Sequence, residues 1–192
     1  MRVLITCGPT WVPIDRVRVI SNRSTGEMGH ALAKAFLKRK AHVTLLEGPM
    51  AFDELKSVLK KEAQKGHDVV IHAAAVSDFK LKTPRKGKIS SYKSLVLKLT
   101  PTPKIIALIK KWSPRTFLVG FKLEPGLTRS RVRRLTRELF RMGCDLVVAN
   151  TVENGYKGFI VDADGHILAQ ASNKKKIAEL LVKLLIRPYG QP

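Results

Sequence analysis

Residues 2–7 read RVLITC, residues 41–46 read AHVTLL and residues 68–75 read DVVIHAAA. Each run is short, apolar and rich in β-branched side chains, which is typical of strands that a parallel sheet buries on both faces. In the two stretches between these runs, 26–40 and 52–65, apolar residues recur at helical spacing. This alternation of strand and helix predicts an α/β fold with a doubly wound, mostly parallel sheet.

The alternation continues toward the C-terminus after a polar, basic stretch. Residues 78–94 contain Pro84 and Gly87 and predict a long loop, which in a compact domain is usually functional or disordered. Further strands are predicted at 95–99, 116–121 and 145–149, and further helices at 101–111, 129–142 and 173–186. Two short runs, 158–161 and 166–169, predict a C-terminal β-hairpin. Because nothing in the 192 residues resembles a linker, we expect a single Rossmann-like domain.

The balance of charged residues is strongly basic. Thirty-six Lys and Arg against fifteen Asp and Glu give a formal net charge of +21 at pH 7. Such a surface attracts nucleic acid, nucleotides, phosphorylated metabolites or anionic lipid. A host whose proteins are generally basic would produce the same number, so the charge alone selects no partner.

Composition excludes several classes of protein. Hydrophobic residues make up 44% and charged residues 27%, which excludes a disordered chain and a coiled coil. No run approaches the roughly 18 apolar residues of a membrane span, and the apolar start ends at Gly8, too soon for a signal peptide. Cys7 and Cys144 lack CxxC spacing, which predicts reduced thiols in a cytoplasmic protein.

Ligands of parallel sheets bind at the carboxyl ends of the strands, so the residues that follow each strand are candidates for a site. The first strand is followed by the turn 8–10 (GPT) and later by residues 21–26 (SNRSTG), which immediately precede a helix. Hydroxyl groups, an amide and a helix N-terminus predict a phosphate or carboxylate site, but Ser24 or Thr25 could simply cap the helix. Residues 26–29 are only a fragment of the GxGxxG dinucleotide motif.

Later strands are followed by residues suited to a nucleotide. Residues 74–78 (AAVSD) would let a planar base approach the backbone, with Asp78 facing a base edge, a sugar or a metal, or serving only as a turn residue. Lys86 and Lys88 suit a triphosphate or a leaving pyrophosphate, or belong to a solvated basic loop. Phe121 could stack on a base or belong to the core.

Arginines are concentrated in the predicted helix 129–142, where they could bind phosphates or form a solvated face. They are Arg129, Arg131, Arg133, Arg134, Arg137 and Arg141. The histidines show no metal-ligand spacing, and no Ser-His-Asp order or pair of acids indicates a hydrolase.

Residues 5–29 read ITCGPTWVPIDRVRVISNRSTGEMG. This stretch resembles the opening of the phosphopantothenoylcysteine synthetase (phosphopantothenate–cysteine ligase) family, which reads ITxGGTxxPIDxVRxISNxSSGxMG. Other family motifs have counterparts at 74–78 (AAVSD), 88–89 (KI), 102–106 (TPKII), 119–124 (VGFKLE) and 145–150 (DLVVAN). The resemblance extends over essentially the whole chain.

The resemblance implies a ligase of coenzyme A biosynthesis. The carboxylate of 4′-phosphopantothenate attacks the α-phosphate of CTP or ATP, pyrophosphate leaves, and the amine of cysteine then attacks the acyl-nucleotidylate and releases the nucleoside monophosphate. Since every substrate except cysteine is anionic, basic side chains and Mg²⁺ are needed to offset repulsion. The resemblance also implies a homodimer without flavin or membrane partner, and it assigns no metal ligands. We expect a stand-alone synthetase, because the flavin-dependent decarboxylase half fused in many bacteria is absent from this sequence.

The resemblance carries site residues over one by one. Asn22 would hold the acyl-nucleotidylate for the attack by cysteine, and Lys88 would support the half-reaction that releases pyrophosphate. The nucleotide would be bound by Ala73, Ala74, Asp78, Lys88, Pro103, Lys104, Ile105, Ile106, Phe121, Arg137 and Arg141. The phosphopantothenate side would be bound by Gly8, Thr10, Ser21, Asn22, Ser24, Thr25 and Gly26.

Four departures from the family pattern stand out. Pro9 replaces a glycine and removes one backbone N–H, and Lys104 replaces an acid and reverses a charge beside the nucleotide. A strand that relatives place between the segments like 46–49 and 52–55 is missing here. Two lysines that relatives place before DLIVAN correspond to Arg137 and Arg141 only with an offset of one residue.

Three other functions stay open at this point. A nicotinamide-dependent reductase would use a similar fold, but the sequence has neither GxGxxG after the first strand nor a Tyr-xxx-Lys pair. A nucleic-acid-binding protein would account for the charge of +21, although aromatic residues for stacking are scarce. The departures at Pro9 and Lys104 would suit a degenerate synthetase that binds its ligands without turnover.

Overall fold

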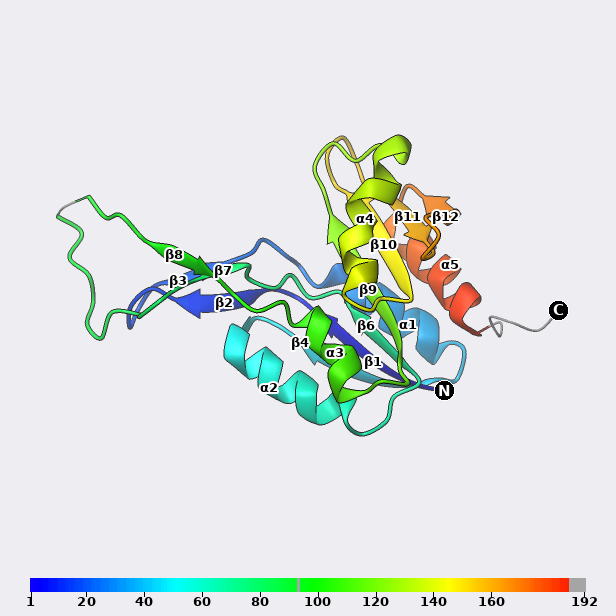
Figure 1. Cartoon of the computed structure of the whole chain (residues 1–192), viewed down its shortest axis with the longest axis horizontal. Helices are drawn as coiled ribbons and strands as arrows, with labels where there is room; N and C mark the ends of the chain where they lie inside the picture. The colour runs from blue at the N-terminus through cyan, green and yellow to red at the C-terminus, as the bar shows by residue number, and fades with distance from the viewer. Residues whose placement is uncertain (93, 187–192) are drawn as a thin grey trace.

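The computed structural model describes residues 1–92 and 94–186, and its centre is a seven-stranded sheet (Figure 1). The strand order is β12-β11-β10-β9-β6-β1-β4. The strands are β1 (Arg2–Cys7), β4 (His42–Glu47), β6 (Val69–His72), β9 (Phe117–Leu123), β10 (Leu146–Thr151), β11 (Lys157–Val161) and β12 (Ile167–Ala171). All neighbours from β4 to β10 pair in parallel, and β11 and β12 form an antiparallel hairpin. The predicted doubly wound sheet with a C-terminal hairpin is confirmed.

Helices cover both faces of this sheet. One face is covered by α1 (Glu27–Leu37) and α5 (Lys174–Ile186), and the other by α2 (Phe52–Ala63), α3 (Ile106–Trp112) and α4 (Val132–Arg141), with the 3-10 turn η1 (Arg129–Arg131) before α4. Successive residues of β1 point to opposite faces, so Val3 and Ile5 pack with α1 while Leu4 packs with α2. We call the sheet and these five helices the body.

The body is held together by apolar side chains that no water reaches. Ile5, Ile71 and Val148 pack with the helices on one side, Leu4 and Leu118 with those on the other, and all five are 0% exposed. Fully burying one such side chain stabilises the folded chain by roughly 1.5–3 kcal/mol. The position of the strand ends is therefore fixed by packing on both sides.

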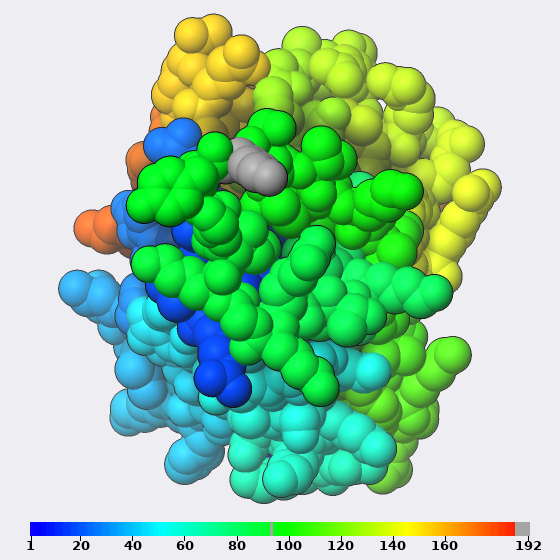
Figure 2. Space-filling model, turned by 90° about the vertical axis from the view of Figure 1, so that its left-hand side faces the viewer, coloured from blue at the N-terminus to red at the C-terminus, as the bar shows by residue number. Residues whose placement is uncertain are grey.

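Short strands outside the body form a projection at the carboxyl ends of the parallel strands (Figure 1). They are β2 (Thr10–Pro13), β3 (Val19–Ser21) and β5 (Met50–Ala51) in one small sheet, and β7 (Phe79–Leu81) and β8 (Leu99–Pro101) in another. We call residues 10–21 and 78–101 the arm. In Figure 2, which faces the arm, side chains of its second segment (green) cover the front of the molecule.

The arm is where the predicted elements differ most from the structure. The strand predicted at 95–99 is wrong, because the strand begins only at Leu99, and Val96 is 85% exposed. The predicted loop 78–94 begins with the strand β7, and β2, β3 and β5 were not predicted. Strands of only two to four residues leave too little apolar alternation in a sequence to be recognised. Among the described residues, no helix is long and apolar enough to cross a membrane.

Candidate active site

A cavity of about 910 Å³ opens at the carboxyl ends of the parallel strands. It lies beside β1 and β6, where the strand order reverses direction and open α/β sheets bind their ligands. Its walls come from four parts of the chain: residues 21–29, 72–78, 102–106 and the facing side of α4. Phe121, Asn150 and Tyr156 close the cavity from the side of β9 to β11.

The structure gathers most of the predicted site residues in this cavity. From the phosphopantothenate set it brings Ser21, Asn22, Ser24, Thr25 and Gly26 to the wall. From the nucleotide set it brings Ala73, Ala74, Asp78, Pro103, Lys104, Ile105, Ile106 and Phe121. Their roles toward particular substrates stay predictions.

Gly8 and Thr10 do not line the cavity, because they build its support instead. The Thr10 side chain is 1% exposed, and its Oγ1 accepts a hydrogen bond from the backbone N–H of Ser77 at 2.8 Å. Backbone bonds from Thr10 to Ala75 (3.0 Å) and from Ala75 to Gly8 (2.9 Å) join the two loops that follow β1 and β6. These residues therefore position the loop that ends in Asp78.

The N-terminus of α1 points its unsatisfied backbone N–H groups toward the cavity. The N-cap is Gly26, at φ 72°, which has no side chain, and the Thr25 hydroxyl accepts the N–H of Glu27 only at a long 3.5 Å. Neither Ser24 nor Thr25 is therefore the N-cap residue, and among the described residues the only side-chain contact to a helical N–H there is the long one from Thr25. Four backbone N–H groups of a helix start lack helical partners, and an uncapped start that lines a cavity can bind a phosphate or carboxylate.

Asn22 is oriented by the loop that follows β6. Its Nδ2 donates a hydrogen bond to the backbone oxygen of Val76 at 2.8 Å. Because one end of the amide is fixed in this way, the other end has a defined direction at the wall of the cavity.

Charged groups in the cavity are partly paired with one another. Lys104 Nζ lies 2.7 Å from Asp78 Oδ1, and Lys174 pairs with Glu27. Lys104 therefore neutralises the very carboxylate that the sequence analysis assigns to the nucleotide. Lys122 and Glu138 also line the cavity. Sequence reasoning missed both, although Lys122 stands directly after Phe121 at a strand end, where ligands are expected.

Two buried polar groups stand at the edge of the cavity. Burial lowers the pKa of His72 to about 4, so this ring is neutral, and it shares a 2.8 Å hydrogen bond between its Nδ1 and Thr6 Oγ1. Burial raises the pKa of Tyr156, and its hydroxyl has no hydrogen-bond partner among the described residues. The Tyr156 hydroxyl is therefore buried and unpaired beside the cavity, and nothing in the sequence pattern singles it out.

The structure does not bring Arg137 and Arg141 to the cavity. The residues of α4 that face it are Leu135, Glu138 and Leu139, and Met142 follows directly after the helix. Arg137 and Arg141 line a second hollow of about 730 Å³, together with Arg133 and the turn between β11 and β12. Consecutive residues of a helix differ by about 100° in direction. An offset of one residue against the family pattern therefore leads to residues of α4 that point away from the cavity.

Lys88 also lies outside the cavity, in the exposed part of the arm. The neighbouring residue Ile89 is held by Asp15, whose Oδ2 accepts its backbone N–H at 3.0 Å, and by Arg18 Nη1, which donates to its backbone oxygen at 3.0 Å. Hydrogen bonds from the backbone N–H groups of Ile89, Val17 and Arg18 lower the pKa of Asp15 to about 2. Asp15 thereby anchors the segment that carries Lys88.

Comparisons with known proteins agree with this architecture. The family described as DNA/pantothenate metabolism flavoprotein C-terminal domain matches residues 1–186. Coenzyme A biosynthesis bifunctional protein CoaBC of Thermococcus kodakarensis is 42% identical over 79% of this chain and 41% of its own length. The chain thus spans about half the length, or less, of the curated relatives it matches.

Two solved structures show the same fold. The DNA/pantothenate metabolism flavoprotein of Streptococcus pneumoniae superposes with a TM-score of 0.80 at 26% identity, covering 96% of this chain and 98% of that one. A Cab2 H337A mutant, solved in complex with phosphopantothenate-cysteine, gives 0.78 at 21% identity, covering 96% of this chain and 85% of that one. With a family match over almost its whole length, this chain belongs to the family of the DNA/pantothenate metabolism flavoprotein C-terminal domain.

Proposed function

We propose that this chain is a phosphopantothenate–cysteine ligase, which joins 4′-phosphopantothenate to cysteine at the expense of a nucleoside triphosphate. The observation that carries the proposal is the cavity at the strand ends, where an uncapped helix N-terminus, Asn22 and a loop of small residues face one another. The proposal is supported by the names of the bifunctional relatives, which state coenzyme A biosynthesis, and by the phosphopantothenate-cysteine in the Cab2 complex.

The phosphopantothenate would lie along residues 21–26 and the start of α1. Its phosphate or its carboxylate suits the N–H groups behind Gly26, because the helix dipole favours negative charge there. Asn22, directed by its bond to Val76, would hold the acyl-nucleotidylate while the amine of cysteine attacks the acyl carbon. The nucleoside monophosphate would then leave.

The nucleotide would lie over the ends of β6 and β9. Ala73 and Ala74 leave room for a flat base near the backbone, and Phe121 offers a ring beside it. Lys104 would exchange its present partner Asp78 for a phosphate, which would release the Asp78 carboxylate toward the sugar. Lys122, the next residue of β9 after Phe121, adds a cation to the wall of the cavity.

The acidic residues of the cavity fit a magnesium ion only in company with the substrates. Asp78 and Glu27 each pair with a lysine, whereas Glu138 makes no ion pair among the described residues. Mg²⁺ is commonly held by one or two carboxylates together with substrate phosphates, and Glu138 with a released Asp78 would suit that arrangement. When bound, the ion would neutralise the charge of the polyphosphate.

The role of Lys88 needs a separate explanation, because this residue lies on the arm and outside the cavity of its own chain. Several apolar side chains of the arm are exposed, among them Val17 (66%), Phe79 (52%) and Val96 (85%). Exposed apolar groups gathered on one projection mark a protein–protein contact. We therefore propose a homodimer whose arm contact brings Lys88 of one chain to the cavity of the other, where it supports the release of pyrophosphate.

Incubation with 4′-phosphopantothenate, Mg²⁺ and either CTP or ATP, with and without cysteine, tests the function. Pyrophosphate release should depend on 4′-phosphopantothenate, and the amide product and nucleoside monophosphate should depend on cysteine. The more active of the two nucleotides identifies the co-substrate. Absence of pyrophosphate with both nucleotides, in a protein that still binds them, would contradict the ligase and favour a degenerate synthetase.

A further inference from the structure

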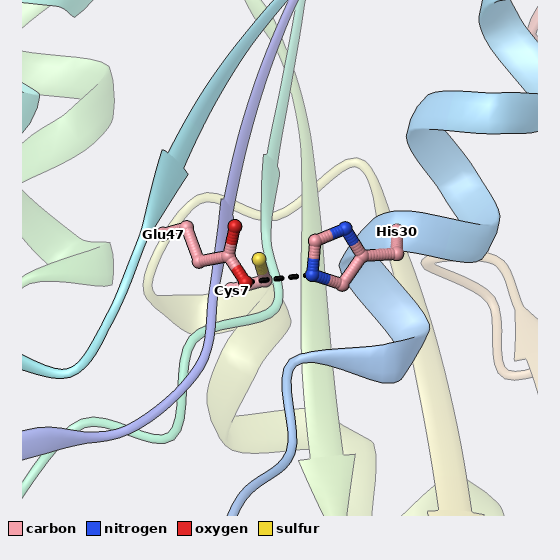
Figure 3. A group of neighbouring side chains, drawn as sticks. All are labelled: Cys7, His30 and Glu47. Atoms are coloured by element: carbon pink, nitrogen blue, oxygen red, sulfur yellow. Dashed lines mark hydrogen bonds and ion pairs between the residues drawn. The ribbon is translucent and has the colours of Figure 1, made fainter.

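Three side chains with metal-binding chemistry meet outside the cavity. Cys7 ends β1, Glu47 ends the neighbouring edge strand β4, and His30 stands on α1. None of the three lines the cavity, and the proposed ligase reaction uses none of them. Figure 3 shows all three side chains directed toward one point between the two strands and the helix.

The distances at this point are already close to those of a metal site. His30 Nε2 lies 2.6 Å from Glu47 Oε1, and the ligand atoms of all three residues lie within 4.8 Å of one another. In Figure 3 the Cys7 sulfur lies beside the line that joins the other two groups. With bonds of about 2.0–2.3 Å to a tetrahedral metal, ligand atoms are spaced about 3–4 Å apart, so a small opening of the His30–Glu47 pair is sufficient.

Packing fixes the sulfur and leaves the other two ligands movable. Cys7 is 2% exposed, and a Cβ on Gly29 would come within 2.7 Å of its Sγ and 2.2 Å of its Cβ. Only glycine at 29 lets α1 run this close to the thiol, and that approach places His30 above it. The side chains of His30 and Glu47 are 51% and 44% exposed, so they can change rotamer at little cost.

The strand register makes the juxtaposition a property of the sheet. Cys7 and Glu47 are direct partners in the parallel pairing of β1 with β4. They stay neighbours as long as β4 stays paired with β1. The pairing of these two strands therefore supplies two of the three ligands, and no loop has to position them.

We propose that Cys7, His30 and Glu47 form a site for Zn²⁺ or a metal of similar preference, with the fourth position open to water. Thiolate, imidazole and carboxylate together are ligands that zinc takes, and three protein ligands with an open position are typical of accessible zinc sites. Mg²⁺, the metal of the proposed reaction, prefers oxygen ligands and would not compete for the sulfur.

Binding at this site requires the thiol to lose its proton. Burial and the neighbouring Glu47 raise the pKa of Cys7 to about 11, so the proton is present before the metal arrives. As the sulfur–metal bond forms, the proton leaves to solvent, and the oxidation states of metal and sulfur stay unchanged. The bound ion would then join the edge strand β4 to α1. The site lies next to Gly26, because a Cβ added at that glycine would be 3.6 Å from Glu47 Oε1.

Titration of the purified chain with Co²⁺, followed by displacement with Zn²⁺, tests the site without any assay of activity. We expect one equivalent of Co²⁺ to give visible bands of a tetrahedral site and a near-ultraviolet thiolate band, both abolished by Zn²⁺. Saturating Zn²⁺ should raise Tm by roughly 5–10 °C, because the ion binds only the folded chain. His30→Ala, at a half-exposed position, should weaken binding by roughly a hundredfold or more while the chain still folds.

Matched variants separate this site from general affinity for metals. His42→Ala removes an exposed histidine of the same edge strand and should leave binding unchanged. His166→Ala removes the histidine of the other group of possible ligands, Asp162, Asp164 and His166, and should also leave it unchanged. Cys7→Ser should abolish the thiolate band. A band that survives Cys7→Ser, or binding that is lost with His166→Ala and kept with His30→Ala, would overturn the proposal.

Discussion

The body and the arm both contain apolar side chains, but the body buries them and the arm leaves several of them exposed. In the body, apolar side chains such as Ile71 and Leu118 are 0% exposed, and helices cover both faces of the sheet. In the arm, strands of three or four residues carry exposed apolar groups such as Phe79, although Val12 of β2 is buried. The body therefore determines stability and the shape of the cavity. The arm carries Lys88, and under the proposed function it supplies that lysine and the contact between subunits.

The largest effect is expected from Lys88→Gln in the arm. Removal of this cation should reduce pyrophosphate release by roughly a thousandfold, because charge that develops on the leaving group loses its partner. The Tm should not change, since Lys88 is exposed. Lys86→Gln, two residues earlier on the same exposed segment, is the control and should retain activity. Normal pyrophosphate release by Lys88→Gln would refute the assignment.

Asn22→Asp, at the border between arm and body, should separate the two half-reactions. We expect pyrophosphate release to continue and the acyl-nucleotidylate to accumulate, with product formation reduced by roughly a hundredfold, as for loss of one oriented polar group. Rapid quench and chromatography would detect the intermediate. Asn154→Asp, on an exposed turn, is the control. Equal loss of both half-reactions would mean that Asn22 acts earlier than proposed.

Truncation of one apolar side chain to alanine in the body and of one in the arm should differ in its effect on the free energy of unfolding. Ile71→Ala leaves a cavity among residues that cannot collapse into it, and should cost about 2–5 kcal/mol of unfolding free energy. Val96→Ala, at a position that is 85% exposed, should change it by less than about 0.5 kcal/mol. Urea denaturation followed by circular dichroism measures both. A comparable loss in the two variants would contradict the distinction between body and arm.

Asp15→Asn tests how the arm positions Lys88. Without the charged acceptor for the Ile89 N–H, kcat for pyrophosphate release should fall by roughly tenfold, while KM for the nucleotide and the Tm stay close to those of the parent. Asp15→Glu should recover part of the rate. If KM rises instead and kcat is unchanged, Asp15 acts on nucleotide binding and not through Lys88.

The same carboxylate gives a pH dependence with a definite sign. The pKa of Asp15 is lowered from 3.8 to about 2 by its backbone hydrogen bonds, so the folded arm favours the charged form. The anchoring is complete above about pH 4 and is lost as the pH falls toward 2. Protection of the Ile89 amide from exchange, relative to its intrinsic rate at each pH, should fall over that window in the parent chain, and Asp15→Asn should show no such change.

The two regions also differ in how far their structure could be predicted from the sequence. Most strands and helices of the body match the prediction, because burial on both faces leaves long apolar runs and clear helical spacing. The helix predicted at 101–111 is an exception: it begins only at Ile106, because Pro101 ends β8 and the residue before Pro103 disfavours helical backbone. The strands of the arm leave no such pattern, and the contact of Asp15 with Ile89 joins residues 74 positions apart without any local signal.

Among the predicted site residues, those next to strand ends lie at the cavity and those on α4 do not. Asn22, Asp78 and Phe121 follow strands, so the topology alone brings them together. On a helix an error of one residue exchanges Glu138 for Arg137, which faces a different hollow. Tyr156 was missed because burial of an unpaired hydroxyl is visible only in three dimensions.

Mixing of two inactive variants tests most directly whether the arm of one chain completes the cavity of another. Lys88→Gln keeps Asn22, and Asn22→Asp keeps Lys88, so a mixed dimer has one cavity with an intact Asn22 that faces an intact arm from its partner. After the two variants are unfolded and refolded together, product formation should recover to about a quarter of the parent rate, since half of the dimers are mixed and each has one complete site. Product formation no greater than that of the separate variants, in a sample shown to contain mixed dimers, would contradict the account and place Lys88 over the cavity of its own chain.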